Sequence, residues 1–478
     1  MSGLRLISEI NNMTRTKILA TIGPASFDKI EQLIEAGVDG IRFNLSHIRP
    51  EEYEHRTNMI KRIKEIDESI FIVGDLEGPK IRLGDFNSIE VKSGDEVAII
   101  PASVYQRKGI PIQFEDFYKY VKSGNLLLVD DGNIGLRIRS VDDKIVRCDV
   151  EYGGIMESRK GVNTPSISIP MPYLSRNDMS HLEFLIENDF DYVSASFSRT
   201  ADDIKQIGEI VNKYNIKKIG KPENHEGKEN LREIIQEADA MMIPRGDYGV
   251  ECGVSHVPAF QKQTIRACNI LGKIVITATQ MLESMMICKE PKRAEVSDVF
   301  NAPLDGTDVV MLSGETSKGK YPIEAVRVMN QILDEAEKYM FDRQNGVNLG
   351  EILNNLIEEK NPADSISKEV YNAAKADYIK AIIVPTSTGY TAQKIARFRI
   401  DKPVIAVTYD KKIRRQLNAV WGVIPLLTSH LGENYVVENS LRLAKEKGYV
   451  SHGDYVIVTA GMGCSGKGST NMLRIEKV

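Results

Sequence analysis

Four short apolar runs follow one another in the middle of the chain: DYVSASF at Asp191–Phe197, KKIGK at Lys217–Lys221, AMMIP at Ala240–Pro244 and KIVITA at Lys273–Ala278. Each run has the length of a β-strand, and a stretch with the apolar spacing of an amphipathic helix separates it from the next. This alternation is typical of βα units that pair into a parallel sheet.

Four further runs of the same kind bring the total to eight, and they lie at Lys17–Ile22, Gly40–Leu45, Ile70–Asp75 and Asp308–Leu312. The predicted helices between and after the runs are Asp28–Glu35, Glu51–Ile66, Arg176–Glu187, Ala201–Tyr214, Lys228–Ala238, Val257–Leu271 and Pro322–Tyr339. Without an interruption at residues 77–165, the segment 16–338 has about 234 residues, near the roughly 250 of a (β/α)8 barrel. The sequence therefore predicts an α/β protein built on a TIM barrel.

The interruption at residues 77–165 alternates apolar and polar residues in short segments that turn residues separate. The predicted strands are Ile89–Val91, Glu96–Ile100, Leu126–Val129, Ile134–Ile138 and Ile145–Val150. We expect a small β-domain, inserted after the third barrel strand as a lid, and assign the barrel to residues 16–76 and 166–345 after an N-terminal segment at 1–15.

Residues 346–478 begin a new alternation after a loop around Asn345–Gly350. The predicted helices are Ala363–Ala376, Thr391–Phe398, Lys412–Ala419 and Asn434–Lys447, and the predicted strands are Ile379–Val384, Val404–Val407, Val423–Leu427 and Asp454–Val458. This pattern indicates a third, open α/β domain at the C-terminus.

The composition excludes several classes of protein. The 478 residues are 42% hydrophobic and 27% charged with a net charge of −5, which excludes extensive disorder and a general attraction for nucleic acid or membrane surfaces. No apolar stretch approaches the roughly 18 residues of a membrane span, and Met1–Met13 lacks a signal-peptide core. The five scattered cysteines suggest no zinc site or redox pair, so we expect a cytoplasmic protein with reduced thiols.

Polar side chains gather where the eight runs end, which is where a TIM barrel carries its active site. They include Arg42, Asn44, Ser46, His47, Asp75, Ser196, Ser198, Arg199, Lys221, Glu223, Asn224, Arg245, Gly246, Asp247, Thr279, Gln280 and Glu315. A single serine or aspartate at a strand end commonly caps a helix or closes a turn. Charged residues that converge from several strands favour a functional site instead.

Glu223 and Asp247 end neighbouring strands, where both carboxylates could face one Mg²⁺ that keeps water and substrate oxygens as its other ligands. Lys221 lies two residues before Glu223, so the two share a strand face, and its ammonium can neutralise a transferring phosphoryl group. Arg42 offers a fork suited to phosphate oxygens. These residues indicate a site for a phosphorylated small molecule.

Two further residues suggest that this molecule also carries a carboxylate and exchanges a proton. The Gly246-Asp247 peptide groups can donate to a substrate carboxylate, because glycine permits close backbone approach. Thr279 supplies a neutral hydroxyl that can relay a proton through water.

The strand ends together carry segments that resemble the pyruvate kinase family, and the resemblance runs from about Thr16 to the C-terminus. The matching segments are Thr16–Ser26, Arg42–His47, Gly74–Arg82, Lys160–Asn163, Lys221–Gly227, Pro244–Glu251, Thr277–Met285 and Met311–Pro322. The resemblance implies that phosphoenolpyruvate and ADP give pyruvate and ATP, the last step of glycolysis, in a homotetramer.

The resemblance also implies residue roles. Lys221 would assist phosphoryl transfer, Thr279 would help protonate the enolate, and Arg42 would hold the phosphoryl group. Glu223 and Asp247 would bind Mg²⁺ or Mn²⁺. Substrate would contact Arg42, Lys221, Gly246, Asp247 and Thr279, and the nucleotide would contact Asn44, His47, Arg82 and Lys160.

The sequence departs from the family pattern at Leu76-Glu77-Gly78-Pro79-Lys80. Potassium-dependent members resemble one another in having Thr-Lys-Gly-Pro-Glu there. In those members the ion is held by side chains that match Asn44, Ser46 and Asp75, and the monovalent-cation position also includes that of Leu76. A lysine ammonium is a compact monovalent cation, so we expect Lys80 to replace potassium and activity not to require K⁺. The alternative is that Glu77 and Lys80 pair in water as a surface charge swap.

The C-terminal domain carries a candidate effector site for a phosphorylated ligand. Thr386, Ser387, Thr388, Gly389 and Thr391 link a predicted strand to a helix, where hydroxyls and free N–H groups suit an anion. In the family this loop resembles the one that holds an effector's phosphate, with Gly461–Ser469 as a second wall and Lys467 as an added charge. The alternative is that Ser387 or Thr388 caps the helix.

Three other functions fit the sequence less well. A magnesium-dependent carbon–carbon lyase on the same barrel would want the Glu223/Asp247 pair but gives no reason for Lys221 or the lid. A non-catalytic nucleotide sensor should have lost a catalytic group. Gly461–Gly468 nearly spells a P-loop, but Gly468 replaces the required Ser/Thr and too little chain follows for such an ATPase.

Overall fold

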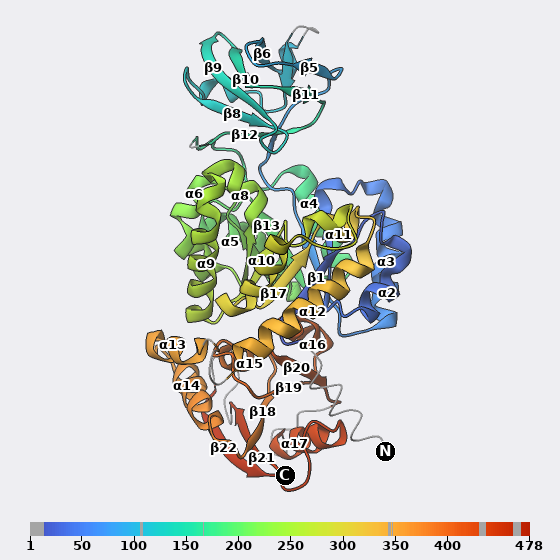
Figure 1. Cartoon of the computed structure of the whole chain (residues 1–478), viewed down its shortest axis with the longest axis vertical. Coiled ribbons are helices and arrows are strands. Elements are labelled where there is room, and N and C mark those ends of the chain that lie inside the picture. Colours follow the sequence, from blue (N-terminus) through green and yellow to red (C-terminus); the bar gives the residue numbers. More distant parts are fainter. Residues whose placement is uncertain are drawn as a thin grey trace.

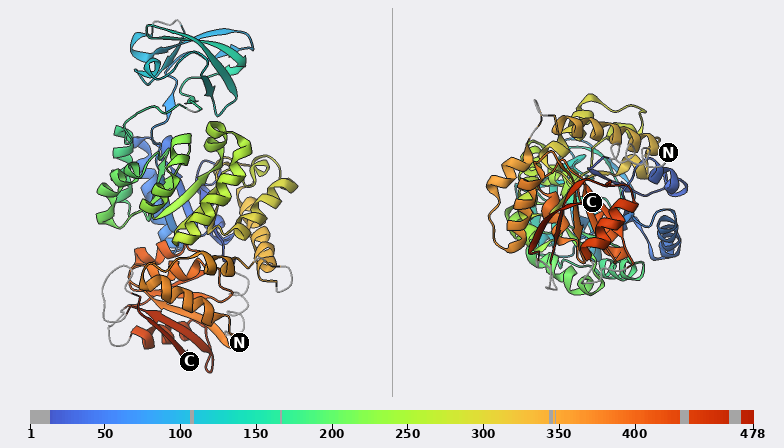
Figure 2. Two further views of the ribbon diagram at one scale, coloured as in Figure 1. Left: turned by 90° about the vertical axis from the view of Figure 1, so that its left-hand side faces the viewer. Right: turned by 90° about the horizontal axis from the view of Figure 1, so that it is seen from below.

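The computed structural model describes residues 14–105, 109–165, 167–342, 346, 348–429, 436–461 and 470–478. Three parts are stacked along the long axis of the molecule, with a β-domain at the top, a barrel in the middle and an α/β domain below (Figure 1). Seen from below, the C-terminal domain lies across the end of the barrel (Figure 2). Within the described residues, no helix is both long and apolar enough to span a bilayer.

The middle part is a closed barrel of eight parallel strands in the order β1-β17-β16-β15-β14-β13-β3-β2. The strands are β1 Lys17–Thr21, β2 Gly40–Asn44, β3 Phe71–Asp75, β13 Tyr192–Ser196, β14 Lys217–Lys221, β15 Ala240–Pro244, β16 Ile274–Ala278 and β17 Val309–Leu312. Nearly every strand residue is buried, because barrel strands pack side chains on both faces. The predicted fold class is confirmed, and each predicted run matches a strand to within one residue at each end.

Helices surround the barrel: α2 Ile30–Glu35, α3 Tyr53–Ile66, α4 Arg176–Glu187, α5 Ala201–Val211, α6 His225–Glu229, α7 Leu231–Glu237, α8 Arg245–Cys252, α9 Val257–Leu271, α10 Arg293–Asp305, α11 Gly314–Ser317 and α12 Pro322–Met340. The predicted helix Lys228–Ala238 is wrong in its bounds, because Asn230 ends α6 and precedes α7. Ser175 begins α4 with a capping box, in which its hydroxyl accepts from the Asp178 N–H. The strand-end helix α8, which carries Asp247, was not predicted.

The chain between β3 and β13 forms the separate β-domain. A seven-stranded sheet has the order β4-β12-β8-β9-β10-β6-β7, and β11 pairs with β5. The strands are β4 Ile81–Arg82, β5 Ile89–Val91, β6 Glu96–Pro101, β7 Ile110–Ile112, β8 Leu126–Val129, β9 Ile134–Asp142, β10 Ile145–Tyr152, β11 Gly154–Met156 and β12 Gly161–Asn163. The five predicted strands are present, and β4, β7, β11 and β12 are short additions that sequence pattern missed.

The C-terminal domain is an α/β layer structure with the strand order β20-β19-β18-β21-β22. Its strands are β18 Ile379–Pro385, β19 Val404–Thr408, β20 Val423–Leu427, β21 Tyr455–Ala460 and β22 Met472–Lys477, and its helices are α13 Leu349–Leu356, α14 Pro362–Ala374, α15 Tyr390–Ala396, α16 Lys411–Leu417 and α17 Val436–Glu446. The predicted open sheet is confirmed. Sequence pattern missed α13 and β22, the latter an edge strand antiparallel to β21.

The barrel and the C-terminal domain share one buried hydrophobic cluster, in which barrel residues such as Phe71 and Met242 belong with Phe398 and Val420. A buried ion pair crosses the same interface, with Arg415 Nε 2.8 Å from Asp191 Oδ1. Burial raises the pKa of Asp191 to about 6 although Arg415 lowers it. The base of the barrel is therefore fixed to the C-terminal domain by both apolar packing and charge.

Candidate active site

A cavity of about 730 Å³ lies at the carboxyl ends of the barrel strands and reaches the β8–β9 turn of the β-domain. Thirteen of the residues for which the sequence predicts a role line it: Arg42, Asn44, Ser46, Asp75, Leu76, Lys80, Arg82, Lys160, Lys221, Glu223, Gly246, Asp247 and Thr279. His47 lies in the 3-10 turn Leu45–His47, but its side chain is outside the described part of the structure, as is Lys467. Ser196 and Ser313 also line the cavity, so its lining includes residues from seven of the eight strand ends and from the inserted domain.

Lys221 ends β14 at the floor of this cavity, where its amine is surrounded by acceptors. Its Nζ donates to Ser196 Oγ at 2.8 Å, and it lies 3.3 Å from Asp75 and 3.2 Å from Glu223. Burial would lower the pKa of Lys221, but Asp75 and Glu223 outweigh it, so the pKa lies above its ordinary value. The amine is therefore a buried, fixed positive charge.

Arg42 and Asp75 form a second buried pair beside Lys221. Arg42 Nε and one terminal nitrogen donate to Asp75 Oδ2 at 2.8 and 2.6 Å, and the other terminal nitrogen donates to Thr21 at 3.0 Å. Burial raises the pKa of Asp75, but Lys221 and Arg42 overcome this effect and bring it down to about 2. Asp75 thus holds both cations in place as a permanent carboxylate.

Glu223 and Asp247 both line the cavity and lie near enough for each to influence the pKa of the other. Burial, together with the nearby Asp247 and Asp75 charges, raises the pKa of Glu223 to about 7 even though Lys221 lowers it. Two adjacent carboxylates are an unfavourable arrangement unless a cation relieves it. Within the described residues no group of three His, Cys, Asp or Glu side chains could hold a metal ion, so a metal here would need water and substrate oxygens as further ligands.

Lys80 reaches the same carboxylates from the connection between β3 and β4. Its Nζ donates to Asp247 Oδ1 at 2.9 Å and lies 3.5 Å from Asp131 in the β8–β9 turn. Burial would lower the pKa of Lys80, but Asp247, Asp131 and Glu223 together raise it. Only 15% of the Lys80 side chain is exposed. The alternative of a solvent-exposed Glu77–Lys80 pair is not what the structure contains, because Lys80 pairs with Asp247 and Glu77 with Arg82.

Thr279 lies directly after β16 in a left-handed conformation. Its φ is 63° and that of Gln280 is 53°, a region that β-branched residues rarely adopt. The Thr279 hydroxyl accepts from the Gly246 N–H at 3.1 Å and donates to the Ala278 carbonyl at 2.7 Å. The Gly246-Asp247 segment and Thr279 are thus neighbours at the ends of β15 and β16.

Arg82 and Lys160 lie at the root of the β-domain and are paired with acidic neighbours. Arg82 contacts Glu77, and Lys160 Nζ lies 2.9 Å from Asp130 and 3.2 Å from Glu157. Both cations also line an adjoining cavity of about 900 Å³ between the barrel mouth and the β-domain. They therefore lie at the junction between two connected spaces.

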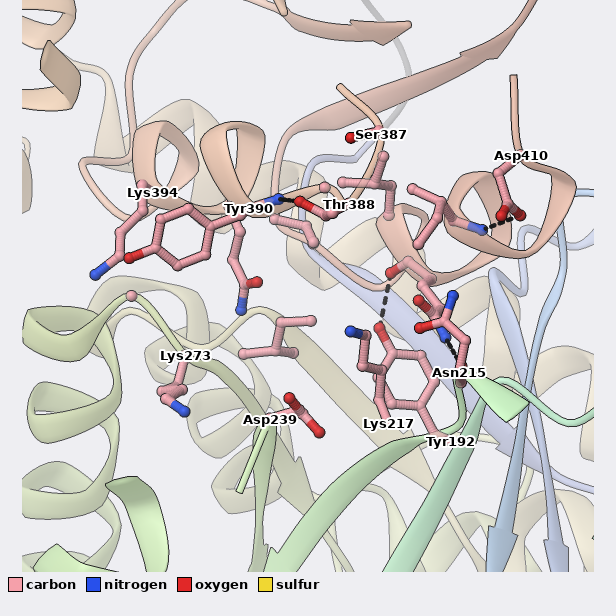
Figure 3. Close-up of a pocket in the computed structure, with 18 of the residues that line it drawn as sticks. Tyr192, Asn215, Lys217, Asp239, Lys273, Ser387, Thr388, Tyr390, Lys394 and Asp410 are labelled. Carbon is pink, nitrogen blue, oxygen red and sulfur yellow. Dashed lines mark hydrogen bonds between the residues drawn. The ribbon is translucent and has the colours of Figure 1, made fainter. Parts of the chain in front are cut away.

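A different cavity, of about 420 Å³, lies between the opposite end of the barrel and the C-terminal domain (Figure 3). Ser387 and Thr388 lie on its upper side in the view, and Lys217, Asp239 and Lys273 lie below. Ser387, Thr388 and Gly389 line this cavity among the candidate effector residues. Tyr192, Lys217, Asp239 and Ile274 place the starts of β13 to β16 in the same lining.

The candidate effector loop contains more structural hydrogen bonds than the sequence suggested. Thr386 accepts from the Gly389 N–H at 2.9 Å, and Thr391 bonds to Thr470. Gly389 is the N-cap of α15 and no side chain caps that helix, although Thr388 Oγ accepts from the Tyr390 N–H at 3.4 Å. Most of Gly461–Ser469, the expected second wall, lies outside the described residues.

Two parts of the site were not found from sequence. The Lys80–Asp247 contact joins residues 167 positions apart on different elements. Arg245 was noted as polar at a strand end, but its hydrogen bonds to Ala278 and Thr279 were not expected. The sequence shows only that a charged residue, Arg245, directly follows a buried strand. That pattern does not predict which backbone groups the side chain contacts.

Comparisons with known proteins match one family, pyruvate kinase, along nearly the whole chain. Residues 13–326 match the family profile "Pyruvate kinase, barrel domain", and residues 364–476 match "Pyruvate kinase, alpha/beta domain". A pyruvate kinase of Clostridium acetobutylicum is 40% identical over 483 residues, which is 98% of this chain and all of the relative. A pyruvate kinase of Staphylococcus aureus is 39% identical over 486 residues, which is 98% of this chain and 81% of the relative.

The fold and these matches define an enzyme of the TIM-barrel class that transfers phosphoryl groups. Within that class, the chain belongs to the pyruvate kinase family. The family implies phosphoenolpyruvate and ADP as substrates and dependence on a divalent metal.

Proposed function

We propose that this enzyme transfers the phosphoryl group of phosphoenolpyruvate to ADP. The bond between phosphorus and the enol oxygen breaks, a bond forms to a terminal oxygen of the ADP β-phosphate, and the released enolate takes a proton at C3 to give pyruvate. The observation that carries the proposal is the buried Lys221 amine, which lies beside the Glu223–Asp247 pair at the barrel mouth.

The cations at the floor of the cavity have distinct tasks in this proposal. Lys221 stabilises the charge that spreads over the phosphoryl oxygens in the transition state, because it is fixed before substrate arrives. Arg42, which Asp75 holds in position, binds the phosphoryl group of the incoming substrate. The Asp247 N–H orients the substrate carboxylate, beside the Gly246 N–H that already donates to the Thr279 hydroxyl.

Glu223 and Asp247 fit a divalent metal, since a cation between them would offset the burial and the carboxylate repulsion that raise the Glu223 pKa. We assign them to Mg²⁺, or Mn²⁺, with substrate and water oxygens completing the ligands. When bound, the metal supplies positive charge to the phosphoryl oxygens. Lys80 occupies only Oδ1 of Asp247, so the second oxygen of this carboxylate would be available to the metal.

ADP would bind where the two connected cavities meet. Arg82 and Lys160 line both spaces, and we assign them, with Asn44 and His47, to the nucleotide. Cations at this junction suit a polyphosphate that must reach the phosphoryl donor on the barrel floor.

A direct assay tests the proposed function. Purified enzyme given phosphoenolpyruvate, ADP and Mg²⁺ should form ATP and pyruvate in equal amounts, and chelation of the metal should abolish both. Absence of ATP under these conditions, with a folded protein, would refute the proposal. We also expect a homotetramer, which the molar mass in solution checks.

Thr279→Ala is expected to slow the protonation of the enolate more than phosphoryl transfer, because the hydroxyl lies beside the proposed carboxylate site and removing it takes away a proton relay. The measurement is the exchange of pyruvate methyl protons with D₂O, compared with the rate of ATP formation. A loss of about 10²-fold would be at the lower end of the range for one group in general acid–base catalysis. An unchanged exchange rate would remove Thr279 from the proton step.

The C-terminal loop is proposed to bind the phosphate of an effector. Phosphorylated metabolites are titrated against the phosphoenolpyruvate saturation curve of wild type and of Ser387→Ala/Thr388→Ala, whose residues line the interface cavity. At least one metabolite should shift the wild-type curve, and the double variant should lose the shift while keeping its maximal rate. Thr386→Ala serves as the control for the turn, since Thr386 bonds to Gly389. A wild type indifferent to every metabolite would leave turn formation as the account of this loop.

A further inference from the structure

We infer that Arg245 is a positioning residue that holds Thr279 in its left-handed conformation and thereby sets the direction of its hydroxyl. This inference rests on the proposed function of Thr279. Arg245 comes directly after β15, two residues before Asp247, and only 8% of it is exposed. It therefore links the strand end that carries the metal carboxylate to the strand end that carries the proposed proton relay.

The guanidinium donates both to the backbone of the turn and to neighbouring side chains, Gln261, Met281 and Asp298. Nε donates to the carbonyls of Ala278 and Thr279, each at 3.0 Å, and a terminal nitrogen also donates to Thr279. The other terminal nitrogen lies 2.6 Å from Asp298 on α10. Asp298 thus fixes the guanidinium from the side of α10, while the guanidinium donates to two consecutive carbonyls of the turn.

The turn needs such a support because its conformation is costly. Non-glycine residues with positive φ are strained and persist only where the surroundings enforce the conformation. Thr279 and Gln280 are two such residues. With the carbonyls fixed, the Thr279 hydroxyl remains between the Gly246 N–H and the Ala278 carbonyl.

A lysine at position 245 would keep the charge but lose the planar fork that reaches both carbonyls at once. The turn would then relax, and the Thr279 hydroxyl would leave its place beside Gly246. Misplacement of a reacting group by about 1 Å can cost about 10²-fold in rate. We therefore expect Arg245→Lys to slow exchange of the pyruvate methyl protons by about 10-fold to 10²-fold.

A double-mutant cycle tests this route of action. Exchange of pyruvate methyl protons with D₂O is measured for wild type, Arg245→Lys, Thr279→Ala and the double variant. If Arg245 acts through Thr279, Arg245→Lys should change the exchange rate by less than about twofold in the Thr279→Ala background, because residues that act as a unit are not additive. Independent, multiplicative losses would overturn the inference.

Matched variants separate this role from general stability. Arg397→Lys alters another buried arginine that donates to a backbone carbonyl and to Asp364, but in the C-terminal domain; it should lower Tm without changing the exchange rate. If Arg245→Lys does not fold, Asp298→Asn, which removes only the outer anchor, replaces it in the same cycle and is judged by the same criterion. If the wild type forms ATP but the losses in the cycle are additive, the role of Arg245 is refuted and the proposed function stands. If the wild type shows neither ATP formation nor proton exchange, the proposed function itself is refuted.

Discussion

Lys221→Met is expected to lower kcat by at least about 10²–10³-fold, because the variant loses a preorganised charge at the transferring phosphoryl group. The neighbouring cations of the described site cannot move into the place of the Lys221 amine, because Asp75 fixes the position of Arg42 and Lys80 pairs with Asp247. Rapid-quench measurement of ATP formation at saturating substrates checks the prediction. Near-normal turnover would contradict the assignment of Lys221.

The same variant should make metal binding depend on pH. The Lys221 charge lowers the pKa of Glu223, which nonetheless lies at about 7 because of burial. Without Lys221 the Glu223 pKa rises further, so the carboxyl is mostly protonated at pH 7 and becomes available to Mg²⁺ only as pH rises. Mg²⁺ titrations of Lys221→Met should therefore show tighter binding at pH 9 than at pH 7, by more than in wild type.

A matched control lies on the same strand. Lys218 is also buried and pairs with Glu237 and Asp239, at 3.6 and 3.9 Å, outside the barrel mouth. Lys218→Met should reduce stability but leave kcat unchanged. If both lysine variants lost turnover equally, the loss in Lys221→Met would reflect damage to β14 and not missing charge.

Turnover without potassium is the second large effect that we expect. Wild type should be about as active in sodium or tetramethylammonium buffers as in potassium, because we propose that the Lys80 ammonium supplies the monovalent charge. Lys80 and the predicted potassium position at Asn44, Ser46, Asp75 and Leu76 line one cavity. A collapse of turnover on removing potassium would show that Lys80 does not have this role.

Two substitutions at Lys80 sharpen the test. Lys80→Met removes the charge, so activity should fall in every buffer. Lys80→Glu places a carboxylate where potassium-dependent relatives have one, so activity should be low in tetramethylammonium and recover with added potassium. Lys92→Met, at a lysine whose side chain is 74% exposed in the β-domain, is the control and should behave as wild type. Equal activity of both Lys80 variants in all buffers would contradict the proposal.

Sequence alone predicted the barrel because its strands are short, buried on both faces and bounded by turn residues, so each strand is visible without knowledge of its neighbours. The missed elements depend on distant partners. β4 has two residues and exists only through its pairing with β12, and β22 needs β21 to complete it. α13 has eight residues and lies next to the predicted loop around Asn345–Gly350, where no predicted strand bounds it, whereas α15 and α16, with seven residues each, lie between predicted strands.

For the candidate site, the sequence predicted which residues lie near one another but not which charges pair. Because strand ends converge in any barrel, the positions of Lys221, Glu223 and Asp247 directly after strand-like runs are enough to predict that the three lie near one another. Which charges pair could not be predicted, because Lys80 reaches Asp247 across the junction of two domains. The support of Thr279 by Arg245 likewise depends on side-chain direction and on backbone angles that residue types do not specify.

Strands β13 to β16 each begin at the cavity above the C-terminal domain and end at the barrel mouth, so each spans the distance between the two cavities. Five extended residues cover about 17 Å, and within the barrel such strands are buried and hydrogen-bonded on both edges. Tyr192 and Lys217 are therefore the far ends of the segments that present Ser196 and Lys221. A substitution that shifts one of these far ends along the strand axis would carry Ser196 or Lys221 with it, although the substituted residue is remote from the barrel mouth. The residues that determine the geometry of the barrel mouth are accordingly more numerous than those that line it.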